Sequence, residues 1–413
     1  MESAMDLQLQ RADLRQFEDG EGGKAKAGLP RLTALIFAVA CGLSVANVYF
    51  AHPLLDAIAR DFAIDPASVG IVVTMTQIGY ALGLFFIVPL GDLFDRRKLV
   101  VTQAVLSALA LIVIGLSPSA AMLLASHAAV GLLAVVVQVL VAYAADLAAP
   151  EERGRAVGTV TSGVILGILL ARFVAGLIAD FAGWRSVYLV SAVLTLVMAA
   201  ILFRVLPRHE AARPPTSYAR LLGSVLLLFV EEPLLRVRAV LALLIFAGFN
   251  VLWAPLVLPL AAPPFSLSHT AIGLFGLAGV AGALGARWTG ILVDRGRGQL
   301  VTGLGLALMA AAWLPIALMS KTLWLLVLGI FMLDLAIQAV HVTNQSLIFA
   351  RRPDARSRLV GGYTIFYSLG SALGSIASTM TYGAWGWTGV CALGGAIGLA
   401  ALVFWAVTLR LGG

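Results

Sequence analysis

Apolar residues occur along this chain in long runs, separated by short polar stretches rich in Pro, Gly and charged residues. A helix needs about twenty mostly apolar residues to cross a bilayer. Twelve runs meet that requirement, six in each half of the chain: 32–53, 68–90, 99–116, 120–147, 155–180, 186–206, 237–260, 269–293, 299–318, 322–349, 358–382 and 385–409. The pattern predicts an all-α membrane protein with twelve transmembrane helices in two six-helix halves.

The polar stretches divide the chain into four parts. Residues 1–31 are expected to form a cytoplasmic tail, 32–206 the N-terminal six-helix half and 237–413 the C-terminal six-helix half. The longest break, 207–236, carries apolar residues with charges at its ends, which is typical of a helix lying on the membrane surface. A plain linker is the alternative interpretation.

Composition supports the membrane class, because 61% of the residues are hydrophobic and 12% are charged, against roughly a quarter charged in soluble chains. If the N-terminus is cytoplasmic, 23 of the 28 Lys and Arg residues fall in the tails and loops of that side. The positive-inside rule then places both termini in the cytoplasm of a plasma (inner) membrane protein. The same distribution accounts for the net charge of +7 without a nucleic-acid partner.

One charged motif occurs twice. Gly91-Asp92-Leu93-Phe94-Asp95-Arg96 and Gly290-Ile291-Leu292-Val293-Asp294-Arg295 both read G-x-L-x-D-R, and their glycines lie 199 residues apart. Such charges would be costly inside a bilayer, so each copy is expected in a polar turn between two spans. A repeat at half the chain length indicates two similar halves joined in tandem.

Twelve spans with G-x-L-x-D-R after spans two and eight resemble the major facilitator superfamily. The glycine-rich stretch of span five, from Gly163 through Gly167 and Ala171-Arg172 to Gly176, resembles a motif of proton-driven antiporters, with Arg172 in place of the usual proline. The run Asn47–Pro53 is similar to uncharacterised bacterial drug-efflux-like members. The resemblance implies two halves around a central cavity that work by alternating access.

The repeated motif is predicted to form a gate. Asp95 and Asp294 could each face a helix N-terminus of the other half, an interaction worth up to ~2 kcal/mol when partly buried. Asp146 is placed to pair with Arg96, and the resemblance implies that such contacts shut the inside of the outward-facing state. The bland alternative is that these are solvated loop charges. The predicted gating residues are Gly91, Asp95, Arg96, Asp146, Gly290, Asp294 and Arg295.

Arg172 and Asp334 lie well inside spans five and ten, where a charge costs at least ~2.5 kcal/mol. Two interpretations stay open. The charges could form a buried ion pair that holds the outer half of the bundle together, or they could form a substrate or proton site that faces a wet cavity. Asp334 is the candidate proton carrier.

Span ten also carries a polar stripe. Asp334, Gln338, His341 and Gln345 recur at helical spacing on one face, which favours a cavity wall. Span four offers a weaker matching face that contains Gln138. Resemblance adds four further wall residues: Asn47, Tyr49, Asn250 and Trp253.

These observations favour a secondary transporter that exports small apolar or amphipathic compounds in exchange for protons. The alternative is proton-coupled uptake of a small organic anion bound by Arg172, and a transporter-like sensor without flux is less favoured. The chain carries no nucleotide-binding loop or catalytic constellation, so we expect no enzyme activity. Two Cys in separate runs provide no metal cluster, and no cofactor is expected. The expected partners are a small-molecule substrate, protons and the bilayer, with the protein a monomer.

Overall fold

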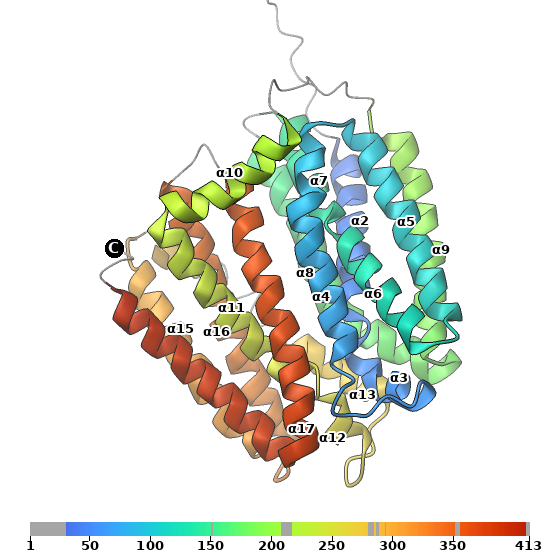
Figure 1. Cartoon of the computed structure of the whole chain (residues 1–413), viewed down its shortest axis with the longest axis vertical. Coiled ribbons are helices and arrows are strands. Elements are labelled where there is room, and N and C mark those ends of the chain that lie inside the picture. Colours follow the sequence, from blue (N-terminus) through green and yellow to red (C-terminus); the bar gives the residue numbers. More distant parts are fainter. Residues whose placement is uncertain are drawn as a thin grey trace, which may run out of the picture.

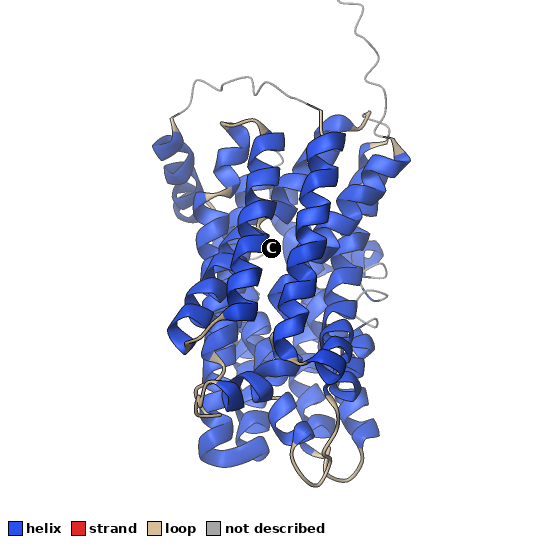
Figure 2. Cartoon of the chain, turned by 90° about the vertical axis from the view of Figure 1, so that its right-hand side faces the viewer, coloured by secondary structure: helices blue, strands red, loops and turns tan. Residues whose placement is uncertain are grey.

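The computed structural model describes residues 30–149, 152–207, 217–279, 285, 289–293, 295–351 and 356–409, with the side chains of residues 92, 356 and 357 left out. Within these ranges the regular elements are all helices (Figure 2). The N-terminal half contains α2 (Arg31–Tyr49), η1 (His52–Leu54), α3 (Leu55–Asp61), α4 (Ile71–Phe86), η2 (Val88–Asp92), α5 (Arg96–Leu116), α6 (Ala120–Ala134), α7 (Val136–Leu147), α8 (Arg153–Ala182) and α9 (Trp184–Val205).

The C-terminal half follows the linker helix α10 (Tyr218–Glu231). Its elements are α11 (Pro233–Trp253), α12 (Val257–Ala261), α13 (His269–Leu274), η3 (Phe275–Gly279), α15 (Gly298–Ala317), α16 (Leu323–Arg351) and α17 (Arg356–Thr408).

The predicted twelve-helix fold is confirmed. Nine helices of the described ranges are long and apolar enough to cross a membrane, and one of them, Arg358–Thr408, has 51 residues. It is broken at Gly386, whose φ of 61° and ψ of −159° are not helical, so this segment crosses twice. The shorter apolar helices Ile71–Phe86 and His269–Gly279 complete the set of twelve.

Large apolar side chains cover the outside of the bundle. Leu32, Leu314 and Val407 are each more than two-thirds exposed, and many others are more than one-third exposed. A soluble protein rarely leaves so much contiguous apolar surface uncovered. This surface therefore faces the hydrocarbon of the bilayer.

In each half, a glycine lets two helices at corresponding positions approach closely. In the N-terminal half, a Cβ added to Gly163 of α8 would lie 2.0 Å from the carbonyl oxygen of Ala38 on α2. In the C-terminal half, a Cβ added to Gly370 of α17 would lie 2.1 Å from the carbonyl oxygen of Leu243 on α11. Small residues at such crossings let backbones approach closely, which favours helix association in membranes. The shared device agrees with the tandem repeat in the sequence.

The two halves meet through α4 with α17 and α8 with α13. Helix α10 lies across one end of the bundle, called here the linker end, and α3, α12 and α13 lie at the other, called here the α13 end (Figure 1). Near the α13 end, Gly70 N–H donates to Thr379 Oγ1 at 3.2 Å and Thr74 Oγ1 donates to the Ala372 carbonyl at 2.8 Å. These bonds join α4 and its preceding turn to α17, so the halves are tied together on the α13 side.

Helix α10 occupies the middle of the predicted linker. It buries Val225 and Leu228, and its Phe229 ring stacks on Phe366 of α17 at a centroid distance of 5.3 Å. Leu226 and Val230 stay exposed. Apolar side chains left uncovered on a helix at the end of the bundle suit contact with lipid, and the position of α10 on a membrane surface stays a prediction.

Candidate functional site

Arg172 lies at the interface of the two halves, in a box of aromatic rings. Its guanidinium carbon is 3.9 Å from the ring centroid of Trp253, 5.1 Å from that of Tyr49 and 5.5 Å from that of Phe249. The side chain is 3% exposed. A desolvated cation over aromatic faces gains about 2 kcal/mol, which offsets part of the cost of burying the charge.

Glycines of the opposite half make room for this side chain. A Cβ added to Gly276 of η3 would lie 3.3 Å from both Cβ and Cδ of Arg172. One turn away, a Cβ on Gly273 of α13 would lie 2.4 Å from the Arg172 carbonyl oxygen. The backbone of α8 and the Arg172 stem therefore rest directly on the α13–η3 segment.

Asp334 of α16 approaches the same segment at its far end. The carboxyl is 8% exposed, and a Cβ added to Gly279 of η3 would lie 2.7 Å from its Oδ2. The direct ion pair considered from the sequence is not formed here, since no nitrogen of Arg172 lies within 4 Å of an Asp334 oxygen in the described part of the chain. The opposite charges thus face one site from two halves without direct contact.

Three of the side chains at this site have polar atoms without a hydrogen-bond partner among the described residues. They are Nε and Nη2 of Arg172, Nε1 of Trp253 and Oδ1 of Asp334, and the Trp253 indole lies close enough to Asp334 to interact with its carboxyl without a well-formed hydrogen bond. Buried polar atoms in proteins are nearly always bonded, and each unmet one costs ~1–3 kcal/mol, more when charged. Two N–H donors, an indole N–H and a carboxyl oxygen at one place form a set that a polar ligand could satisfy.

Further hydrogen bonds join the halves around this set. The hydroxyls of Tyr49 and Tyr367 lie 2.8 Å apart. Nε2 of His52 lies 3.3 Å from Oδ1 of Asn250, and Ser375 Oγ donates to the same oxygen at 3.3 Å. Tyr49 and Asn250, both predicted as wall residues, therefore lie at the interface, as Trp253 does.

The span-ten stripe runs from this site toward the linker end. Its His341 has Nδ1 3.0 Å from the Tyr363 hydroxyl and its ring packs on Phe246. Gln338 and Gln345 are half-buried. Polar side chains at this depth that are neither fully buried nor in the exposed apolar surface suit the wall of a wet cavity.

Two predicted wall residues lie elsewhere. Oδ1 of Asn47 accepts a 2.6 Å hydrogen bond from Ser191 of α9, so Asn47 joins two helices within the N-terminal half. Gln138 of α7 donates to the Tyr80 hydroxyl at 3.5 Å, also within that half. Neither contacts Arg172 or Asp334.

At the linker end, the first copy of the repeated motif is bonded within its own half. Asp95 caps α5 by accepting from the backbone N–H of Arg97 at 2.8 Å and of Lys98 at 3.3 Å. Arg96 forms an ion pair with Asp146 and donates from Nε to the Gly91 carbonyl at 3.1 Å. The predicted contact of Asp95 with the other half is not present in this conformation.

The second copy is only partly described, because Asp294 lies outside the described residues. Gly290 has open space around its Cα, and Arg295 is exposed. The gating role of both copies stays a prediction.

Sequence reasoning missed Phe249, Tyr367 and His52 at the site. A signal existed for Phe249, because it lies one helical turn before Trp253 on span seven. Tyr367 carries no such signal, since only the meeting of the two halves brings its hydroxyl to that of Tyr49.

A cavity of about 420 Å³ lies apart from this site, between α2, α8 and α9. It is lined by apolar side chains such as Leu35, Val39, Leu166 and Leu194, which are exposed on the membrane side of the bundle. The lining of this cavity includes none of the charged residues described above.

Comparison with known proteins agrees with this architecture. The family model described as Major Facilitator Superfamily matches residues 35–351 and 239–412. The chain is 47% identical over 371 residues to the uncharacterized transporter YgaY of Escherichia coli O157:H7, covering 90% of this chain and 94% of that protein. It is 32% identical over 383 residues to the probable transporter SCO4007 of Streptomyces coelicolor, covering 92% and 88%.

A solved structure shares the fold. The bacterial homologue of the human lysosomal transporter Spinster, crystallised in an inward-facing and occupied conformation, matches with a TM-score of 0.74 and 14% identity, over 92% of this chain and 97% of that one. Matches to the family model over most of the chain, together with relatives above 30% identity, establish the family. The protein belongs to the Major Facilitator Superfamily and is a multi-pass membrane transporter.

Proposed function

We propose that this protein is a proton-coupled secondary transporter that exports small amphipathic compounds by alternating access. The observation that carries the proposal is the set of unpartnered buried atoms on Arg172, Trp253 and Asp334, at the interface of the halves. A site at such an interface changes its access when the halves rock against one another.

The conformation described here is inward-facing in this proposal. The positive-inside rule assigns the linker end to the cytoplasm. The hydrogen bonds from Gly70 and Thr74 to α17 close the α13 end, while Asp95 at the linker end caps α5 of its own half. Substrate would therefore reach Arg172 from the cytoplasm, past the half-buried polar stripe of α16.

Asp334 is the proposed proton carrier. A carboxyl that is 8% exposed, with Oδ1 unpartnered, is costly to keep charged and can be neutralised by a proton. Substrate that places a polar group near Oδ1 would favour a different protonation state. That difference in affinity is what couples the proton to the movement of substrate.

The aromatic box favours substrates with an apolar body, since Trp253, Tyr49 and Phe249 present ring surface beside one cation. The export direction rests on the resemblance of the span-five glycines to those of antiporters. In the structure, Gly176 of that motif lies against the backbone of His269 in the other half.

Proton-coupled uptake of a small organic anion is the second candidate. Nε and Nη2 of Arg172 are both unpartnered, and a guanidinium can donate in parallel to the two oxygens of a carboxylate. The two candidates differ in the sign of the coupling, because uptake moves proton and substrate the same way.

The test begins with a thermal-shift screen of purified protein against metabolites and drugs, and continues with flux of the hits in proteoliposomes. A proton gradient directed toward the cytoplasmic side of the protein should be imposed across the vesicle membrane. It should drive substrate away from that side if the protein is an exporter and toward that side if it is an uptake symporter. Asp334→Asn should abolish accumulation driven by the pH gradient and preserve substrate binding and gradient-free exchange.

Asp65→Asn is the matched control, since this exposed loop carboxyl accepts only from the Ala67 N–H at 2.8 Å. If the Asp334→Asn protein still moves substrate against its gradient with pH as the only driving force, Asp334 is not the coupling residue. If the parent protein moves none of the hits, the proposal that it transports those compounds is wrong.

A further inference from the structure

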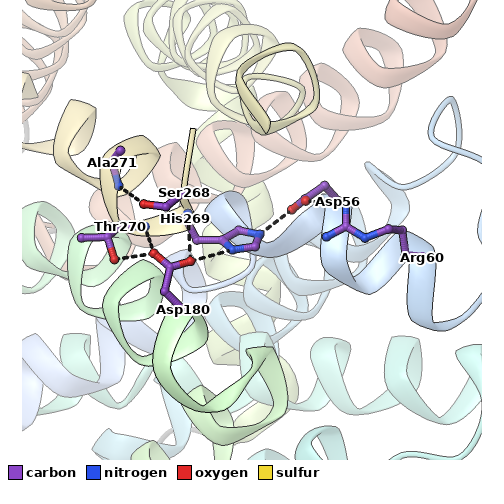
Figure 3. A network of polar contacts seen from close by, with 7 residues as sticks. All are labelled: Asp56, Arg60, Asp180, Ser268, His269, Thr270 and Ala271. Carbon is purple, nitrogen blue, oxygen red and sulfur yellow. Dashed lines mark hydrogen bonds and ion pairs between the residues drawn. The ribbon is translucent and has the colours of Figure 1, made fainter. Parts of the chain in front are cut away.

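A second polar cluster, centred on His269, lies at the α13 end (Figure 3). His269, the first residue of α13, stands between two carboxylates of the N-terminal half. Its Nε2 is 3.0 Å from Oδ1 of Asp56 on α3, and its Nδ1 is 3.1 Å from Oδ1 of Asp180 on α8. The cluster therefore ties both elements to the opposite half.

The geometry requires two donors on the imidazole. A neutral histidine carries one N–H, and its other nitrogen has a lone pair. Here both ring nitrogens face carboxylate oxygens at hydrogen-bond distance. A neutral ring would set its lone pair against one carboxylate, whereas the imidazolium donates to both.

Other contacts hold the two acids as acceptors. Asp180 accepts from the backbone N–H of His269 at 3.1 Å and of Thr270 at 2.8 Å, and from the Thr270 hydroxyl at 2.6 Å. Oδ2 of Asp56 lies 2.9 Å from Nη1 of Arg60. Asp180, engaged by several donors, is an ionised carboxylate rather than a protonated acid, and the Arg60 guanidinium favours the ionised form of Asp56 although it makes no hydrogen bond to Oδ2.

We propose that His269 is a proton-binding site whose protonation stabilises the closed contact between the halves at the α13 end. The site goes beyond the proposed function, since it uses neither Arg172 nor Asp334. Its ligand is a proton rather than a metal, because no group of three His, Cys, Asp or Glu suited to a metal ion occurs in the described ranges.

The other charged or titratable groups on the elements that pack against His269 either have partners of their own or lie farther from the α13 end. On α3, Asp61 pairs with Arg185 at 3.0 Å. On η1, His52 is bonded to Asn250. On α8, Arg172 lies two turns deeper than Asp180, and α12 and η3 carry no titratable side chain. His269 is 20% exposed, so protons from solvent reach it.

The sign follows from the two states. With the halves in contact, the imidazolium has two carboxylate partners. With the halves apart it loses both, so the closed state binds the proton more tightly. Lowering the pH through the range where imidazole titrates should therefore favour the closed state.

The experiment measures the distance across the α13 end as a function of pH. Spin labels at Ser68→Cys and Ala384→Cys, both exposed, report on the two halves, and the native Cys41 and Cys391 are buried. From about pH 8 to about pH 5.5, the closed-to-open ratio should rise about tenfold, the effect of one hydrogen bond to a charged group. His269→Gln should remove that response, because glutamine gains no charge.

Asp180→Asn serves as the second variant, because asparagine still caps a helix but offers no charge, and it should also reduce the response. Asp61→Asn is the matched control at the same end of the bundle, within one half, and should leave it unchanged. A ratio that does not vary with pH in the parent overturns the proposal. So does a response that persists in His269→Gln, or one that is lost equally in Asp61→Asn.

Discussion

At the scale of single residues, Arg172 shows how a buried charge is accommodated without a counter-ion in direct contact. Three aromatic rings and two glycines surround it, and Asp334 approaches from the other half without touching it. Aromatic faces lower the cost of burial but leave N–H groups free. Arg172 is therefore held in place by packing while its hydrogen-bonding capacity stays available to a ligand.

Arg172→Lys should weaken substrate binding about tenfold with little effect on stability. A lysine ammonium keeps the charge, but it lacks the planar surface that stacks on Trp253 and the fork that binds a carboxylate. Isothermal titration with a hit from the screen measures the change. Arg185→Lys, which alters an arginine paired with Asp61 far from the site, should bind normally.

A double change separates this reading from a structural ion pair. Arg172→Ala and Asp334→Ala should each lower the melting temperature, and the double variant should melt below either single one, since the two side chains interact through space but form no direct ion pair. A double variant that is better folded than either single variant would instead mean that the two side chains form an ion pair, because each single substitution then leaves the other charge buried without a partner.

At the scale of elements, the glycines of α8 allow two contacts at once. Gly163 and Gly167 rest on α2 of their own half, and Gly176 rests on His269 of the other. The first contact holds the N-terminal half together, and the second belongs to the interface between the halves. One helix thus packs tightly both within its half and across the interface.

Gly163→Ala should destabilise the protein by about 1–3 kcal/mol, because its Cβ would collide with the Ala38 carbonyl and push α2 from α8. Gly158→Ala on the same helix has nothing within 4 Å and should be neutral or slightly stabilising, since alanine favours helix. Melting temperatures in detergent distinguish the two. Equal melting temperatures would mean that the α2–α8 crossing is not tightly packed.

At the scale of the whole molecule, the two ends behave differently. The α13 end is bridged by hydrogen bonds between the halves, and the first G-x-L-x-D-R motif at the linker end bonds within one half. Alternating access requires the reverse arrangement in the other state. The motif would then contact the C-terminal half.

Asp95→Asn tests that exchange of contacts. Asparagine caps a helix as well as aspartate does, so α5 should form normally and the protein should reach the membrane. The charge needed in the other state is lost, and transport should fall severely. Initial flux in vesicles, normalised to the amount of protein, is the measurement, and flux equal to the parent would rule out the latch.

The sequence predicts the spans well, because bilayer thickness fixes the length of a span and each span is one continuous apolar run in the sequence. It also places Arg172 and Asp334 inside spans. It could not predict that Tyr367 meets Tyr49, or that His269 lies between Asp56 and Asp180, since those contacts depend on how helices from different halves pack. Nor could it predict that Asn47 bonds to Ser191 in its own half, and the place of Asn47 on a cavity wall stays a prediction.

The carboxylate of Asp180 also affects the stability of α13, in addition to joining the two halves. Because it accepts from the first two N–H groups of α13, a residue of the other half adds to the cap that Ser268 provides through the Ala271 N–H. A helix end without its cap loses about 1 kcal/mol and frays. Separation of the halves would remove the Asp180 acceptor and leave Ser268 to cap α13, so we expect the first turn of α13 to be less stable when the halves are apart.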